Sequence, residues 1–304
     1  EVAPLPRANE AVRGYAAFEA RLFTPVDASS LAVFRIAFGG LILWDVVHYF
    51  VYDLIRYKYL QPYLLFKYYG FEWVEPWPGD GLYYHFAALG LFALLVMVGL
   101  FYRVAIVLLT IAFTYVFLLD QTDYLNHFYF VILLGCLLCL APANRAWSLD
   151  AWLGTGTGGA VPGWSVWILR AQMEIMLIYA GIVKINPDWL QLAPLRGWLA
   201  QSADLPLVGP LLLQDWVVAI AAYGPIALHI VGAPLLLFRR TRLWTFGLYC
   251  AFHLSNHVLF NIGIFPWLTI AGTTIFFAPD WPRRVVARIV ALAGRTLAAR
   301  ASGS

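Results

Sequence analysis

Residues 243–278 read LWTFGLYCAFHLSNHVLFNIGIFPWLTIAGTTIFFA and contain no Asp, Glu, Lys or Arg. One helix needs about 20 apolar residues to cross a bilayer, so this run predicts two spans, near 243–260 and 262–278. The composition of the whole chain agrees, because its 304 residues are 62% hydrophobic and only 12% charged, whereas soluble domains carry about 25% charge. The chain is therefore predicted to be an integral helical membrane protein, which excludes a soluble enzyme and a nucleic-acid binder.

The rest of the chain repeats this pattern and predicts an all-α bundle of about eight transmembrane helices. The six earlier spans are expected near 29–50, 82–101, 103–119, 125–141, 164–184 and 216–238. Two segments rich in Tyr, Trp and Pro, residues 51–81 and 187–214, are predicted to form interfacial helices and loops, where amphipathic rings prefer to lie.

Three parts of the chain are predicted. Residues 1–27 are polar, carry no apolar signal-peptide run and form a cytoplasmic N-terminal segment. Residues 28–280 form the transmembrane domain. Residues 281–304 form a basic amphipathic tail that is expected to lie on an anionic membrane surface.

The distribution of basic residues predicts the orientation. With both termini in the cytoplasm, thirteen of the 20 Lys and Arg residues lie on the cytoplasmic side and five on the other, as the positive-inside rule requires. The same topology places three polar connections together on the non-cytoplasmic side: 120–127, 184–196 and 256–265. A shared site facing that side is the first functional hypothesis.

Ionisable residues inside a bilayer are costly and are functional candidates. Arg170 and Glu174 are four residues apart and are predicted to form a structural ion pair on one helix face. Lys184 ends a long apolar run, so its amine either reaches toward the headgroups or is desolvated and serves as a base. His127 opens the fourth span and is either a structural residue or part of the same site. His253 and His257 have a metal-compatible spacing, but no third ligand follows and no metal is predicted.

Five sequence elements, taken in order, resemble one known family over residues 28–284. They are Phe34-Arg35-Ile-Ala-Phe-Gly39, Phe117-Leu-Leu-Asp-Gln-Thr-Asp-Tyr-Leu-Asn126-His127-Phe-Tyr129, Pro142-Ala-Asn-Arg-Ala-Trp-Ser-Leu-Asp150, Tyr179-Ala-Gly-Ile-Val-Lys184-Ile-Asn-Pro-Asp-Trp189, and His253-Leu-Ser-Asn256-His-Val-Leu-Phe260-Asn-Ile-Gly-Ile-Phe265 followed by Pro279-Asp-Trp-Pro282. They resemble the vitamin K-dependent γ-glutamyl carboxylases and their bacterial relatives, the horizontally transferred transmembrane (HTTM) proteins. The chain resembles a short bacterial member, and we expect it to lack the large lumenal domain of the animal enzymes.

This resemblance implies an enzyme that oxygenates reduced vitamin K or menaquinol to the epoxide, with O₂ and CO₂ as co-substrates. The reaction is coupled to carboxylation of glutamate in a secreted peptide or protein. Lys184 matches the family's catalytic lysine, and His127 matches a histidine that stabilises a developing oxyanion. The residues implied to bind the quinone are Asn126, His253, Asn256 and Phe260.

Two other functions remain open. Some HTTM relatives assist the maturation of secreted peptides and need not carboxylate anything. A transporter is less favoured, because the sequence shows neither inverted repeats nor paired broken helices. The expected partners are membrane lipid, a lipid quinone and a peptide substrate, with no nucleic acid.

Overall fold

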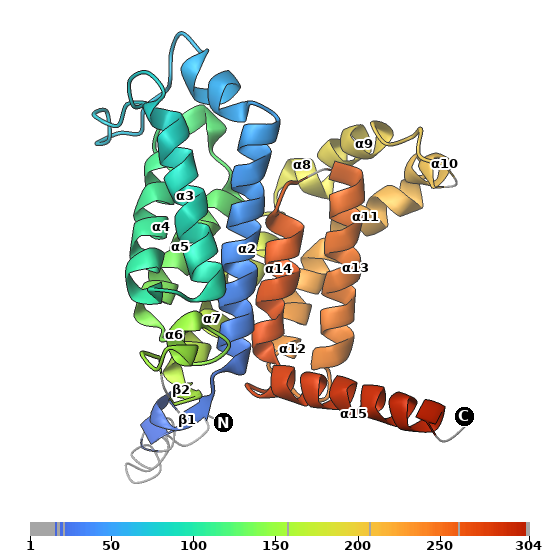
Figure 1. Cartoon of the computed structure of the whole chain (residues 1–304). Helices are drawn as coiled ribbons and strands as arrows, with labels where there is room; N and C mark the ends of the chain where they lie inside the picture. The colour runs from blue at the N-terminus through green and yellow to red at the C-terminus, as the bar shows by residue number, and fades with distance from the viewer. Residues whose placement is uncertain are drawn as a thin grey trace.

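Helices occupy all the stretches that the sequence predicted to span the membrane (Figure 1). The computed structural model describes residues 16, 19–20, 22–156, 158–206, 208–260 and 262–301. Most of the predicted segment 1–27 therefore lies outside the described residues. The elements, in chain order, are β1 (Pro25–Asp27), α2 (Ser29–Val51), η1 (Arg56–Leu60), α3 (Gly81–Val98), α4 (Tyr102–Phe117), η2 (Gln121–Asp123), α5 (Asn126–Leu140), α6 (Leu149–Trp152), β2 (Ala160–Pro162), α7 (Trp164–Ile182), α8 (Pro187–Leu190), α9 (Ala193–Ala200), α10 (Gly209–Leu212), α11 (Asp215–Ala227), η3 (Leu228–Gly232), α12 (Ala233–Leu235), α13 (Arg242–Phe260), α14 (Phe265–Thr273), η4 (Thr274–Phe276) and α15 (Trp281–Ala301).

Four of the described helical segments are long and apolar enough to cross a membrane. They are Ser29–Val51, Gly81–Val98, Trp164–Ile182 and Asp215–Leu235. Helices α4 and α5 and the segment Phe265–Phe276 are apolar but shorter. Helix α13 has 19 residues, but its second half carries two histidines, a serine and an asparagine. The chain is thus a helical membrane protein, while the number of eight crossings stays a prediction.

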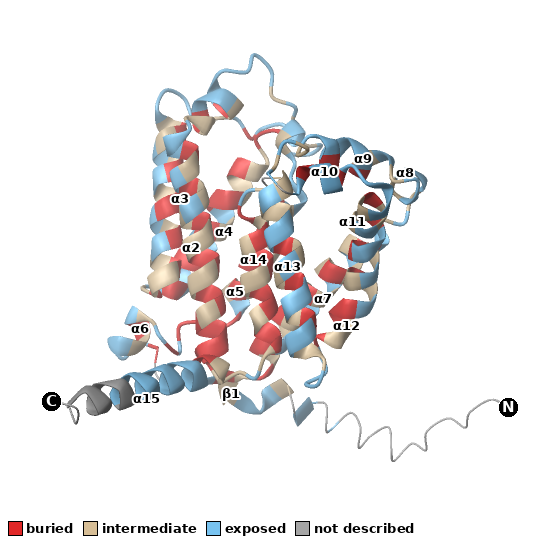
Figure 2. Ribbon diagram, turned by 90° about the vertical axis from the view of Figure 1, so that its right-hand side faces the viewer, coloured by how far each residue is buried: buried red, intermediate tan, exposed pale blue. Residues whose placement is uncertain are grey.

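The helices form two groups that meet along α2 and α14 (Figure 1). Helices α2 to α5 pack in sequence as antiparallel neighbours, and α5 contacts α7. Segments α11 and η3 then pack on α7, and α13 packs on α14. Buried residues follow the inner faces of these helices, and most residues on the outer faces are exposed (Figure 2). Because lipid is as apolar as these side chains, such exposed apolar faces are expected of a membrane bundle.

Arg35 and Asp150 fix the turn between α3 and α4. The Arg35 side chain is fully buried, and its guanidinium donates to the carbonyl oxygens of Val96 at 2.8 Å and Met97 at 2.9 Å. Asp150 accepts from the backbone N–H groups of Phe101 and Tyr102 at the start of α4. A cation therefore lies at the C-terminal end of one helix and an anion at the N-terminal end of the next, which suits both helix dipoles.

The two ends of the bundle differ in chemistry. At the upper end in Figure 1, residues 51–81 and helices α8–α10 cover the helix ends, and the Lys58–Asp123 ion pair of 3.1 Å holds the first of these segments. The connections 120–127, 184–196 and 256–265 all lie at this end (Figure 1), and that this end faces the non-cytoplasmic side stays a prediction.

At the lower end, α15 runs across the bundle at a steep angle to its helices (Figure 1). The side chains of Ile289, Val290 and Leu292 are each about 60% or more exposed. Arg283 pairs with Asp27 at 2.9 Å and thereby holds the start of this helix against β1. The described part of the tail thus has the exposed apolar side chains and the arginines that a helix lying on a membrane surface requires.

Candidate functional site

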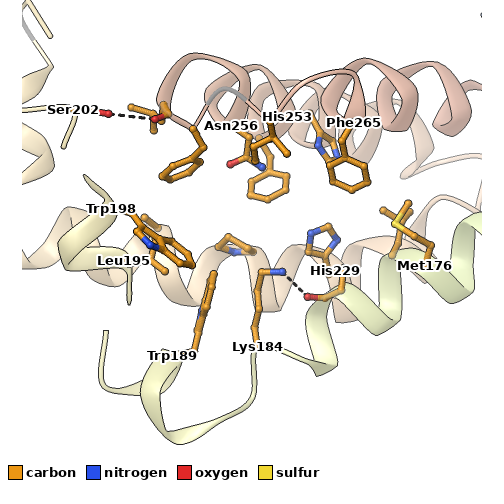
Figure 3. Close-up of a pocket in the computed structure, with 18 of the residues that line it drawn as sticks. Met176, Lys184, Trp189, Leu195, Trp198, Ser202, His229, His253, Asn256 and Phe265 are labelled. Atoms are coloured by element: carbon orange, nitrogen blue, oxygen red, sulfur yellow. Dashed lines mark hydrogen bonds between the residues drawn. The ribbon is translucent and has the colours of Figure 1, made fainter. Parts of the chain in front are cut away.

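A cavity of about 660 Å³ is lined by residues of α7, α8, α9, α11, η3 and α13, and Figure 3 shows the side chains on its wall. Its volume falls within the range of about 300–1,000 Å³ that small-molecule sites occupy. The polar side chains on its wall are Lys184, Gln201, Ser202, His229, His253 and Asn256. Among the lining residues that the structure describes, none is acidic.

Lys184 contributes the only amine among the described residues of this wall. It lies two residues beyond the end of α7, and its Nζ donates to the carbonyl oxygen of Ala180 at 2.6 Å. The same nitrogen lies 5.3 Å from the centre of the Trp189 ring. Burial lowers the pKa of the Lys184 amine, because removing an ammonium from water disfavours its charged form. The structure thus provides a desolvated amine with no carboxylate on the described wall to hold its proton.

Trp189 and two further aromatic residues form the side of the cavity next to Lys184. Asn186 caps α8 by accepting from the backbone N–H of Trp189, and the Trp189 indole donates to the carbonyl oxygen of Ala222 at 2.9 Å. The ring of Trp198 packs edge-on against both Trp189 and Phe260. These contacts fix an apolar aromatic wall beside the amine.

Two histidines face each other across the cavity (Figure 3). His229 is 3% exposed and His253 is 1% exposed. Nδ1 of His229 and both ring nitrogens of His253 are buried without a hydrogen-bond partner. Buried polar atoms are nearly always paired in folded proteins, so unpaired imidazole nitrogens on a cavity wall indicate that a ligand with polar atoms completes them.

His229 lies on the cavity wall at an irregularity in the long helical segment Asp215–Leu235. Pro225 lies inside α11, and the following five residues form the π-helical segment η3. Proline lacks an N–H and removes one helix hydrogen bond, and π-helical turns frequently mark functional sites. On the facing helix, a Cβ at Gly181 would lie 2.9 Å from Cβ of His229, so glycine permits this close approach.

A second, apolar chamber of about 690 Å³ adjoins the first. It lies between the segment Asp215–Leu235 and α13. The residues on both chamber walls are Leu195, Ala221, Pro225, Phe252, Asn256, Leu259 and Phe260. Its outer wall includes Ile220, Val231 and Leu248, which are each about 60% exposed. The site thus combines a polar compartment with an apolar one that borders the outer surface of the bundle.

The HTTM domain matches residues 23–281 of the chain. The chain belongs to the HTTM family. The matched region contains the whole bundle and both chambers. No solved structure matches the chain.

The HTTM fold brings four of the predicted site residues together. Lys184, His253, Asn256 and Phe260 all lie on the wall of the first chamber. His127 does not lie on this wall, but its ring packs 5.7 Å from that of Phe265, which does. The catalytic role of His127 stays a prediction.

Asn126 and the predicted ion pair lie apart from the cavity of this HTTM protein. Asn126 is exposed at the start of α5 and does not line either chamber. Arg170 donates to the carbonyl oxygens of Ile275 and Phe277, each at 2.8 Å, and both carboxylate oxygens of Glu174 have no hydrogen-bond partner. The predicted Arg170–Glu174 pair is therefore corrected, because carbonyls at the end of η4 take the guanidinium instead.

Sequence reasoning missed His229 in this HTTM chain. A signal was present, since His229 is the only titratable residue between Tyr223 and Arg239 and lies between Pro225 and Pro234. An imidazole in an apolar span is costly, and a nearby proline indicates a broken helix. Among the described residues, His, Cys, Asp and Glu do not gather in threes that could hold a metal ion.

Proposed function

We propose that this HTTM protein oxygenates a lipid hydroquinone, reduced vitamin K or menaquinol, with O₂ and couples the reaction to γ-carboxylation of glutamate in a secreted peptide or protein. The observation that carries this proposal is the desolvated Lys184 amine in a cavity with unpaired imidazole nitrogens and an apolar extension. In the overall reaction, one oxygen atom of O₂ enters the quinone epoxide and the other leaves as water. CO₂ replaces a γ-proton of the glutamate.

The donor set of the cavity fits a hydroquinone. Such a ring carries two hydroxyl groups, and the free nitrogens of His253 and the amide of Asn256 lie opposite Lys184 to bind the second of them (Figure 3). The Trp189 and Phe260 rings offer apolar surface for the ring itself. The prenyl tail has space in the apolar chamber, which borders the membrane.

Lys184 performs the first proton transfer in this proposal. A bound hydroquinone that has lost a hydroxyl proton reacts with O₂ and supplies the strong base that glutamate deprotonation requires. The neutral Lys184 amine accepts that hydroxyl proton, and the low local polarity keeps the amine neutral before substrate binds. Once protonated, the ammonium is stabilised by the carbonyl of Ala180 and the face of Trp189. His253 and Asn256 orient the opposite hydroxyl.

Filling the apolar chamber should separate tail recognition from ring chemistry. A Cβ at Gly224, on the chamber wall, would come no closer than 4.0 Å to another side chain. Gly224→Phe is therefore expected to fold and to raise KM for a long-tailed menaquinol about tenfold or more. KM for menadiol, which has no tail, should not change.

Gly247→Phe is the matched control, because Gly247 is exposed on α13 and a Cβ there meets no atom within 4 Å. It should alter neither constant. Equal KM values for the long-tailed quinol in Gly224→Phe and wild-type protein would refute the assignment of this chamber.

A product assay tests the function itself. Purified protein in nanodiscs receives reduced vitamin K, O₂, labelled bicarbonate and a glutamate-containing peptide, and epoxide and fixed label are measured separately. We expect both products. Epoxide without label would retain the oxygenase and refute coupling to carboxylation. Absence of both products, together with absence of quinol binding, would refute the proposal and favour a peptide-maturation factor.

A further inference from the structure

We propose that the His229 imidazole is the hydrogen-bond donor that stabilises the oxyanion formed when Lys184 removes a hydroxyl proton from the bound hydroquinone. This inference rests on the proposed function and adds to it a residue that touches the reacting oxygen. A new negative charge in an apolar cavity is costly unless donors are already aimed at the atom that carries it. The Lys184 ammonium supplies the opposite charge, and His229 supplies an N–H.

His229 lies at the same turn of α7 as the Lys184 amine. A Cβ at Gly181 would lie 2.9 Å from Cβ of His229, and the Lys184 Nζ donates to the carbonyl oxygen of the preceding residue, Ala180, at 2.6 Å. Both side chains line the cavity, and they are drawn next to each other in Figure 3. A substrate oxygen that gives its proton to Lys184 therefore comes within reach of this imidazole.

The His229 ring is free to form this hydrogen bond. The residue is 3% exposed, and its Nδ1 is buried without a hydrogen-bond partner. Buried polar atoms are nearly always paired in folded proteins, so a ligand in the cavity is the natural partner of this ring. Histidine carries at least one ring N–H in either protonation state, and its role as a donor therefore requires no change in its charge.

The polar groups around His229 leave its N–H to the substrate. The Tyr249 ring centre is 5.5 Å from that of His229, but the Tyr249 hydroxyl donates to the carbonyl oxygen of Leu228 at 3.0 Å. His253 faces the same cavity from α13, and both of its ring nitrogens are also unpaired. No carboxylate is present among the described lining residues. A substrate oxygen is thus the acceptor that the fold leaves open.

The step balances without a further reactant. The hydroquinone O–H bond breaks, an N–H bond forms on the neutral Lys184 amine, and the electron pair of the broken bond stays on the oxygen. His229 keeps its own proton throughout and shares it with that oxygen. The sequence resemblance predicts this role for His127, but the His127 ring packs on Phe265 and does not line the cavity. His229 is the imidazole that the fold places beside the base.

Titration of a bound nitronaphthol tests the hydrogen bond without any turnover. This probe has a ring system of naphthoquinol size and a single hydroxyl, and its absorbance distinguishes the hydroxyl from the oxyanion. Protein in nanodiscs is measured against empty nanodiscs, and the bound population in the cavity is the one that responds to Lys184→Met. In His229→Leu the pKa of the bound probe should rise by about one to two pH units, because its oxyanion loses a hydrogen bond. His229→Gln, whose carboxamide still offers an N–H, should recover most of this shift.

Steady-state kinetics test the role in turnover. His229→Leu should lower kcat for epoxide formation about 10²-fold, as expected for the loss of one oxyanion donor. KM should change little, because the charge develops only after the quinol has bound. His229→Gln should restore kcat to within about tenfold of the wild type. His257→Leu is the matched control, since the His257 ring packs on Trp267 at 5.2 Å and does not line either chamber. It should alter neither kcat nor the titration of the probe.

The outcomes separate this inference from the proposed function. An unaltered titration in His229→Leu and in a second variant without a donor, His229→Met, would overturn the hydrogen bond, as would a probe that does not bind at all. A shift in His127→Leu instead would assign the oxyanion to His127. If wild-type protein made no epoxide while His229→Leu still shifted the titration, the proposed function would fail and the hydrogen bond would stand.

Discussion

Replacing Lys184 by methionine is expected to abolish epoxide formation while the bundle stays folded. Methionine keeps the apolar stem that packs beside Trp189 but removes the amine, so the loss reports on the base alone. General-base catalysis contributes about 10²–10⁴-fold to a rate, and we expect a loss of at least about 10³-fold. The measurement is epoxide formed per folded molecule, with quinol binding measured on the same samples.

Lys184→Arg is the decisive companion variant. A guanidinium keeps the positive charge and its attraction to the Trp189 ring, but it does not deprotonate in proteins and cannot serve as a base. It should therefore be as inactive as Lys184→Met. Epoxide formation at a wild-type rate by either variant would remove Lys184 from the chemistry.

The pH dependence of epoxide formation should also be set by the Lys184 amine. Lys184 acts in its neutral form, so activity should rise as pH rises through its pKa and level off above it. Because burial lowers this pKa, the midpoint should lie below the range of an exposed lysine.

The helices and the convergence of the site residues could be predicted from the sequence. The helices depend on the length of the apolar runs, and the convergence depends on the alternating direction of successive helices. Apolar runs of membrane-spanning length form helices, and antiparallel neighbours place every second connection at the same end. That is enough to bring Lys184 together with His253, Asn256 and Phe260 from a segment about 70 residues later.

The rest depends on tertiary geometry that spacing does not encode. The four-residue interval from Arg170 to Glu174 would allow an ion pair on an isolated helix. In the folded bundle, the guanidinium of Arg170 instead donates hydrogen bonds to the carbonyl oxygens of Ile275 and Phe277. His229 faces the cavity because of a π-helical turn, which changes the face on which later residues lie. A regular helical wheel could not assign it.

Arg35→Leu is expected to lower the free energy of unfolding by about 3–5 kcal/mol. The Arg35 side chain is the largest of the fully buried side chains, and besides Val96 and Met97 it donates to the carbonyl oxygen of Trp147 at 2.5 Å. Leucine would leave these acceptors buried without a donor. Chemical unfolding in mixed micelles gives the measurement.

Two further variants make the Arg35 prediction specific. The free energy of unfolding of Arg35→Lys should lie between those of Arg35→Leu and the wild type, because a compact ammonium cannot donate to all the carbonyl oxygens that a planar guanidinium reaches together. Gly99→Ala should also destabilise, since Gly99 has a φ of +70° and a Cβ there would lie 2.3 Å from Nη1 of Arg35. Arg288→Leu, on the exposed part of α15, should change stability by less than about 0.5 kcal/mol. A wild-type stability for Arg35→Leu would show that the carbonyls find other donors and that the α3–α4 turn holds without its cation.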